Sequence, residues 1–110
     1  MRFAFVMRVR EGMEDHYRTL HAEGNPVNEA IRQACRESGI SHYTLFMGGP
    51  TGRWIFGFFE AKNVTESMAR LAAHPANAPW QEMITPLMEV TATFQGDGSV
   101  EKLTEVFHLD

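Results

Sequence analysis

The chain opens with an alternating pattern of apolar and polar side chains. Residues 2–10 place an apolar side chain at every second position, which is typical of a β-strand with one buried face. The residue patterns of segments 40–47 and 53–60 predict two further strands, and the glycine- and proline-rich segment 48–52 predicts a turn that joins them. A last strand is predicted from about residue 100 to 108. The apolar face of the first strand is formed by Phe3, Phe5, Met7 and Val9.

Between these strands the apolar positions recur at helical spacing. The helical period begins at residue 11, is interrupted by Gly24 and Pro26, and then resumes. Asn63, with Glu66 three residues later, is typical of the N-terminus of a further helix, and a fourth helix follows it. The four apolar stripes are Met13, Tyr17 and Leu20; Val27, Ala30, Ile31, Ala34 and Cys35; Val64, Met68, Leu71 and Ala72; and Trp80, Met83, Ile84 and Leu87.

The order of these elements predicts the fold class. Strand, helical region, strand, strand, helical region and strand make an α+β fold of the ferredoxin-like type, β-α-β-β-α-β, with an antiparallel sheet and helices on one face. No internal repeat, low-complexity tract or linker divides the chain, so residues 1–110 are expected to be a single domain. No segment remains to cover the other face of the sheet. A second copy stacked sheet against sheet would cover it, which predicts a homodimer in the form of a dimeric α/β barrel.

Composition narrows the classes of function. The net charge is -4, and the 10 lysine and arginine residues form no basic cluster, which argues against a nucleic acid partner. No stretch approaches the roughly 20 apolar residues of a membrane span, and the apolar run at the N-terminus is too short for a signal peptide. The single cysteine, Cys35, can form no internal disulfide, so a cytoplasmic location is expected.

The sequence gives no sign of a metal or a cofactor. No histidine lies at zinc-type spacing from Cys35 or from another histidine. The glycine-rich stretch 48–52 leads into a strand and has no Lys-Ser/Thr after it, so it is a turn rather than a phosphate-binding loop. We therefore expect neither a metal nor a bound cofactor. The histidines are His16, His21, His42, His74 and His108.

Tyr17 and His21 are the first candidates for chemistry. They are four residues apart on the first predicted helix, so their side chains lie on the same face. A neutral imidazole can take or give a proton near neutral pH, and a phenol can hydrogen-bond to a sugar and stack on its ring. By itself this spacing is more typical of the polar edge of a core than of a catalytic site.

Pieces spread over nearly the whole chain resemble the L-rhamnose mutarotase family. The resemblance rests on their combination and order at this chain length, and the fold of the family is the dimeric ferredoxin-like barrel. The pieces are Ala4-Phe5-Val6-Met7-Arg8-Val9, Tyr17-x-x-x-His21, His42-Tyr43, Trp80-x-x-Met83 and Leu103-x-Glu105-Val106-Phe107-His108-Leu109.

The resemblance implies a reaction and a site. His21 would be the proton donor, and Tyr17, Tyr43 and Trp80 would contact the sugar. The reaction would interconvert the α and β anomers of L-rhamnose or a related aldopyranose through the open aldehyde. An acid protonates the ring oxygen while a base or water takes the proton of the anomeric hydroxyl, and the sequence does not identify that base. The implied partners are a monosaccharide and a second copy of the chain, with no cofactor.

The chain departs from the family pattern around the expected pocket. Pro79 stands before Trp80, where the family usually has a second tryptophan. Ala22-Glu23-Gly24 is inserted before Asn25-Pro26, and Val27-Asn28-Glu29 lacks the tryptophan of the family. These changes bear on which sugar is bound more than on whether a sugar ring is opened.

Two other functions stay open on the same fold, because one fold supports many activities. One is a cofactorless monooxygenase, or a related oxidative enzyme, that acts on an aromatic substrate. The other is a ligand-binding or regulatory domain without catalysis, in which replacement of His21 would leave the function unchanged.

Overall fold

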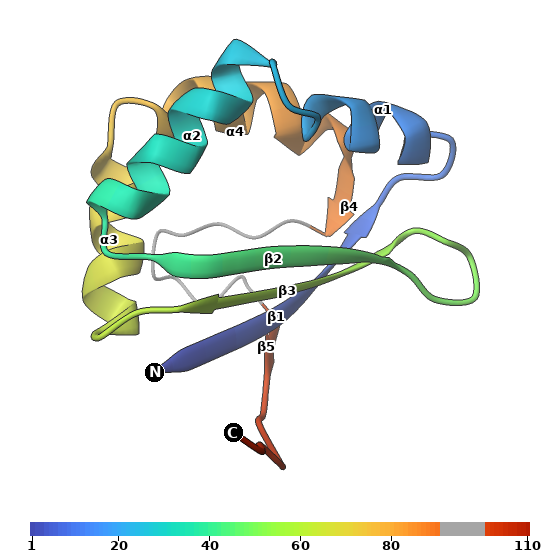
Figure 1. Ribbon diagram of the computed structural model, residues 1–110. Coiled ribbons are helices and arrows are strands. Elements are labelled where there is room, and N and C mark those ends of the chain that lie inside the picture. The colour runs from blue at the N-terminus through green and yellow to red at the C-terminus, as the bar shows by residue number, and fades with distance from the viewer. Residues whose placement is uncertain (91–100) are drawn as a thin grey trace.

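The computed structural model describes residues 1–90 and 101–110, and it has an antiparallel sheet with helices packed on one face (Figure 1). The strands are β1 (Arg2–Val9), β2 (Ser41–Gly48), β3 (Trp54–Glu60), β4 (Met88–Val90) and β5 (Glu101–Leu103). The helices are α1 (Glu14–Leu20), α2 (Pro26–Glu37), α3 (Val64–Ala73) and α4 (Asn77–Ile84), and a short 3-10 helix, η1 (Thr85–Leu87), follows. Among the described residues no helix is both long enough and apolar enough to cross a membrane. The predicted α+β class with an antiparallel sheet is confirmed.

Strand β1 lies in the interior of the sheet. The order of strands is β2-β3-β1-β4, and β5 also pairs with β1. On one side β1 pairs with β3, from Arg2 opposite Glu60 to Arg8 opposite Trp54. On the other side β1 pairs with β5 in its middle and with β4 near its end. Two short strands therefore share the second edge of β1.

Asparagine side chains set the starts of two helices. At α2, Oδ1 of Asn25 accepts hydrogen bonds from the backbone N–H groups of Val27 at 3.0 Å and Asn28 at 3.1 Å. At α3, Oδ1 of Asn63 accepts one from the N–H of Glu66 at 3.0 Å. The helix start predicted from the spacing of Asn63 and Glu66 is confirmed.

The core lies between the helices and the inner face of the sheet. Phe5 and Phe59 are fully buried there, and a buried side chain of this size contributes about 1.5–3 kcal/mol. Phe5 of β1 stands opposite Gly57 of β3, and its ring occupies the space that a side chain at Gly57 would need. The ring of Tyr43 packs edge-on against Phe5, with centroids 6.2 Å apart. The core thus supports a residue that the sequence places in the candidate site.

The outer face of the sheet has no helix over it in the described part of the chain (Figure 1). Phe46 of β2 and Phe56 of β3 stand opposite each other on this face and are 64% and 42% exposed. Beyond β5, the apolar side chains of Val106, Phe107 and Leu109 are also exposed. An apolar surface on the sheet and an apolar tail are both left uncovered.

The last strand is shorter than the sequence predicts. Strand β5 ends at Leu103, whereas the alternating pattern extends the strand as far as His108. Leu103 pairs with Ala4, so a longer antiparallel strand would place residue 105 opposite Arg2. The residues after 105 would then lie beyond the start of β1 and have no strand to pair with there. The ion pair between Nε of Arg2 and Oε1 of Glu105, at 2.5 Å, lies at that limit. Alternation makes a strand only where a neighbouring strand supplies hydrogen bonds.

The sequence analysis also missed strand β4. The fourth helix predicted from the sequence reaches Leu87, but α4 ends at Ile84, and Pro86 lies in η1. Proline has no N–H for a continuing helix, so the chain leaves the helix and becomes extended at Met88. The loop predicted at residues 95–99 lies outside the described residues.

Two helical predictions need correction. The first helix begins at Glu14 rather than near residue 11. In α2 the buried positions include Asn28, which is 3% exposed, whereas Ala30 of the predicted apolar stripe is exposed. The face that α2 turns toward the sheet therefore carries a polar side chain.

We expect Gly57→Ala to lower the free energy of unfolding by about 1–3 kcal/mol, because an added Cβ would stand 2.3 Å from Cζ of Phe5 and overpack the core. Urea denaturation followed by circular dichroism measures the change. Gly48→Ala is the matched control, since a Cβ there meets nothing within 4 Å. Equal unfolding midpoints in the two variants would contradict the close approach of Phe5 to Gly57.

Candidate active site

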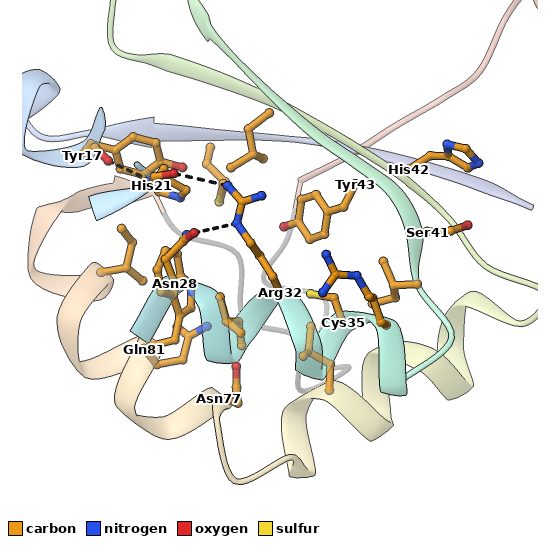
Figure 2. A pocket seen from close by; sticks show the side chains of 18 of the residues that line it. Tyr17, His21, Asn28, Arg32, Cys35, Ser41, His42, Tyr43, Asn77 and Gln81 are labelled. Carbon is orange, nitrogen blue, oxygen red and sulfur yellow. Dashed lines mark hydrogen bonds between the residues drawn. The ribbon is translucent and has the colours of Figure 1, made fainter. Parts of the chain in front are cut away.

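A cavity of about 720 Å³ lies between the inner face of the sheet and helices α2 and α4 (Figure 2). Its volume is within the range of small-molecule pockets. Residues from β1, α1, α2, β2, α3, α4 and β4 contribute to its wall. The polar and aromatic residues of the wall include Tyr17, His21, Asn28, Arg32, Tyr43 and Trp80.

The backbone of α1 fixes the proton on the imidazole of His21, which is the C-cap residue of that helix. Nδ1 of His21 lies 2.8 Å from the carbonyl oxygen of Tyr17. A carbonyl oxygen can only accept, so Nδ1 carries the proton and donates it to this hydrogen bond. Nε2 of the neutral ring then carries a free lone pair, because no group in the described part of the chain hydrogen-bonds to it. The imidazole is therefore arranged to accept a proton through Nε2.

Two aromatic rings enclose the imidazole of His21. Its ring centroid lies 4.3 Å from that of Tyr17 and 5.0 Å from that of Trp80, which meets it edge-on. Burial lowers the pKa of His21; the hydrogen bond to Tyr17 raises this pKa, and the charge of Arg32 lowers it further. The net pKa lies below the ordinary value for histidine. At pH 7 the ring is neutral and Nε2 is free of a proton.

Tyr43 reaches the cavity from a strand with an irregular register. The pairing of β2 with β3 shifts between Ser41 and Thr44, which marks a β-bulge. His42, inside the bulge, has a φ of 52°, in the left-handed region that a residue with a side chain seldom adopts. Bulges bend a strand and redirect its side chains, often beside functional sites. Here the side chain of Tyr43 lies against Phe59, with ring centroids 5.5 Å apart, and forms part of the cavity wall.

The hydroxyl groups of both tyrosines and the thiol of Cys35 keep their protons. Burial raises the pKa of Tyr17 and of Tyr43 well above the ordinary value for tyrosine. Burial also raises the pKa of Cys35 to about 11. A neutral phenol can donate and accept hydrogen bonds, but it does not serve as a base near neutral pH. The tyrosines are thus suited to hold sugar hydroxyl groups.

Arg32 and Asn28 bring further polar groups into the cavity from α2. Nε of Arg32 donates to Oδ1 of Asn28 at 2.7 Å, and Nη2 of Arg32 donates to the carbonyl oxygen of His21 at 3.4 Å. Figure 2 shows the guanidinium group of Arg32 between His21 and Tyr43. A positive charge therefore stands close to the candidate proton-transfer residue.

The cavity brings together all four residues that the sequence analysis proposed for the site. They are His21 and Tyr17 from the end of α1, Tyr43 from β2 and Trp80 from α4. Their individual roles remain predictions. The sequence analysis did not single out Asn28 and Arg32, although their four-residue spacing beside the apolar stripe of α2 was an available signal.

No metal-binding cluster is present in residues 1–90 and 101–110. No group of three His, Cys, Asp or Glu side chains there is close enough together to hold an ion. His42, the second histidine of the cavity wall, has a side chain that is 73% exposed, with Nε2 3.8 Å from a carboxylate oxygen of Glu60. His42 therefore lies at the rim of the cavity. Among the described residues of the cavity wall, His21 is the histidine that lies inside.

Comparison with known proteins points to one family. A family model described as L-rhamnose mutarotase matches residues 2–109. The chain belongs to the L-rhamnose mutarotase family. The L-rhamnose mutarotase of Flavobacterium johnsoniae is 31% identical over 110 residues, which is 100% of this chain and 96% of that protein. The L-rhamnose mutarotase of Brucella anthropi is 32% identical over 108 residues, or 98% of this chain and 95% of that protein.

A solved structure of a family member has the same fold. The L-rhamnose mutarotase of Formosa agariphila superposes with a TM-score of 0.73 at 22% identity and covers 100% of this chain and 99% of that one. The family and the enzyme class predicted from the sequence are confirmed: the protein is a sugar mutarotase, an isomerase. The monooxygenase and the non-catalytic domain find no support in these comparisons. The cytoplasmic location stays a prediction.

Proposed function

We propose that the protein interconverts the α and β anomers of L-rhamnose or a related aldopyranose, and that Nε2 of His21 transfers the proton. The observation that carries this proposal is the hydrogen bond from Nδ1 of His21 to the carbonyl oxygen of Tyr17, because it leaves Nε2 as a proton acceptor in a cavity that can hold a sugar. The names of the related proteins support L-rhamnose as the sugar.

Ring opening requires two proton transfers at neighbouring oxygens, and one imidazole can make both. Nε2 of His21 takes the proton of the anomeric hydroxyl, and the bond between the anomeric carbon and the ring oxygen breaks. The imidazolium then gives the proton from Nε2 to the ring oxygen, which leaves an open aldehyde and a neutral imidazole. Rotation of the aldehyde group and the same transfers in reverse close the ring as the other anomer. His21 thus keeps the proton-donor role that the sequence predicts and also supplies the base.

Tyr17, Tyr43 and Trp80 are proposed to bind the sugar. The phenol groups of Tyr17 and Tyr43 are protonated and can hydrogen-bond to sugar hydroxyl groups. The indole of Trp80 stands edge-on to the imidazole of His21 and offers an apolar surface to a sugar ring. Together these groups exclude water from Nε2 and orient the anomeric centre toward it.

We expect His21→Gln to slow the catalysed exchange of L-rhamnose anomers by about 10²–10⁴-fold, because the variant has no group that can accept and return a proton. Saturation-transfer NMR on the anomeric protons measures the exchange rate. His16→Gln, which replaces an exposed histidine of α1, is the matched control and is expected to exchange at the parent rate. Equal rates in the parent and in a folded His21→Gln variant would exclude His21 as the proton-transfer residue.

We further propose that the fold is ferredoxin-like and that the protein works as a homodimer with the sheets face to face. The strand order β2-β3-β1-β4 and the helical regions on either side of the β2–β3 hairpin support that fold. The exposed pair Phe46 and Phe56 on the outer face supports the dimer, since exposed apolar patches mark association sites. The exposed tail from Val106 onward would find its partner strand in the second copy.

We expect Phe46→Glu to convert a dimer into a monomer, because it would bury a carboxylate between the two sheets without a partner. Sedimentation velocity at several protein concentrations measures the assembly. Met13→Glu, at an exposed apolar residue before α1 and away from the outer face, is the control and is expected to stay dimeric. A parent protein that sediments as a monomer at all concentrations would refute the dimer.

A further inference from the structure

The charges of the cavity wall are unbalanced. Arg32 and Arg36, whose side chains are exposed, both line the cavity, and none of the lining residues in the described part of the chain is an Asp or a Glu. Most arginines elsewhere in these residues have carboxylate partners, as in Arg8 with Glu89 and Arg70 with Glu66. The side-chain partners of the two cavity arginines are neutral amides, Asn28 for Arg32 and Gln33 for Arg36. A guanidinium group without a counter-ion in a binding cavity favours a ligand that carries negative charge.

Arg32 is held in place with donors to spare. Its Nε donates to Oδ1 of Asn28, a side chain that is 3% exposed and so has little freedom to move. Its Nη2 makes one longer contact with the carbonyl oxygen of His21. The N–H groups of Nη1 and the second N–H of Nη2 have no partner among the described residues, and they can bind a carboxylate. Asn28 belongs to the stretch that lacks the tryptophan of the family, so this arrangement occupies a place where the chain departs from the family pattern.

The chemistry of aldopyranoses suggests where on the sugar such a charge would lie. In the proposed function, Nε2 of His21 takes the proton of the anomeric hydroxyl and gives it to the ring oxygen. The ring oxygen of a hexopyranose is bonded to C5, and C5 carries the exocyclic carbon C6. The C6 group is therefore a close exocyclic neighbour of the ring oxygen, and Arg32, which hydrogen-bonds to the backbone carbonyl of His21, lies beside the residue that acts on that oxygen. In L-rhamnose that group is a methyl, which offers a guanidinium no hydrogen bond, whereas in a hexuronate it is a carboxylate.

We propose that the site accepts hexuronates, aldopyranoses with a carboxylate at C6, and that Arg32 binds this carboxylate while His21 exchanges the anomers. The inference rests on the proposed function of His21 and extends it to a class of substrate. The spare donors of one planar guanidinium match one carboxylate, and D-glucose 6-phosphate, whose phosphate ester the same donors could bind, is included in the test as the competing anion. Arg36, farther along α2, adds to the positive potential of the cavity.

The test compares sugars that differ at C6 alone. The anomeric exchange of L-mannuronate is measured beside that of L-rhamnose and L-mannose, which have the same configuration at every ring carbon, and D-glucuronate is measured beside D-glucose and D-glucose 6-phosphate. We expect the catalysed rate at limiting substrate concentration to be about tenfold or more higher for a uronate than for its neutral hexose, the size of one charge-assisted hydrogen bond.

Arg32→Gln tests the residue. We expect this variant to lower the ratio of the uronate rate to the L-rhamnose rate by about tenfold or more, mainly through a higher half-saturating concentration of the uronate. Arg32→Lys keeps the positive charge but loses the planar guanidinium group. We expect its rate ratio to lie between that of Arg32→Gln and that of the parent. Arg70→Gln removes an arginine of α3 outside the cavity and is the matched control, with the parent ratio expected.

The outcomes separate this inference from the function on which it rests. Exchange of L-rhamnose without faster exchange of any uronate would overturn the inference and leave the proposed function standing. An unchanged rate ratio in Arg32→Gln, or a preference for the phosphate ester over the uronate, would overturn it as well. No acceleration with any of these sugars would overturn both.

Discussion

The hydrogen bond between Nδ1 of His21 and the carbonyl oxygen of Tyr17 decides which nitrogen of the imidazole is available for chemistry. A backbone carbonyl at the end of a helix has an unsatisfied acceptor, and a histidine four residues later supplies the donor. The tautomer follows from this bond, because a carbonyl cannot give a proton. Burial against Tyr17 and Trp80 then keeps the ring neutral, so Nε2 has its lone pair free at neutral pH. Anomer exchange needs such a group, since the proton must go back to the sugar in the same cycle.

The rest of the fold holds this group at the wall of a cavity of about 720 Å³. The buried rings of Phe5 and Phe59 fix the inner face of the sheet, and the bulge in β2 places Tyr43 against them. Helix α2 closes the other side, where Asn28 holds Arg32 beside His21. The positive charge at that point contributes to the lowered pKa of His21 and, if the site accepts hexuronates as proposed, binds the carboxylate of the substrate. Catalysis and specificity would then depend on neighbouring positions of α1 and α2.

Much of this arrangement could be predicted from the sequence, because local patterns determine it. Alternation predicted the long strands, and the spacing of Asn63 and Glu66 predicted a helix start. The family resemblance identified four of the residues that line the cavity. The features that were missed depend on contacts between distant segments. The length of β5 is limited by where β1 begins, and the bulge at His42 exists in the pairing of two strands. Asn28 is buried because of the way α2 packs on the sheet. The apolar periodicity of a helix of this length locates the packed face only to within about one residue.

The most direct test of the proton-transfer role of His21 is the pH dependence of L-rhamnose anomer exchange, corrected for the uncatalysed rate and compared with an NMR titration of the His21 ring. Because the neutral ring accepts the first proton, and because its pKa is lowered by burial, the catalysed rate should be constant near pH 7. It should fall as the pH drops through the pKa of His21, at a midpoint below the ordinary value of about 6.5. The NMR midpoint should coincide with that of the rate. A catalysed rate that rises as His21 becomes protonated would contradict the proposal, because the imidazolium would then be the reactive form.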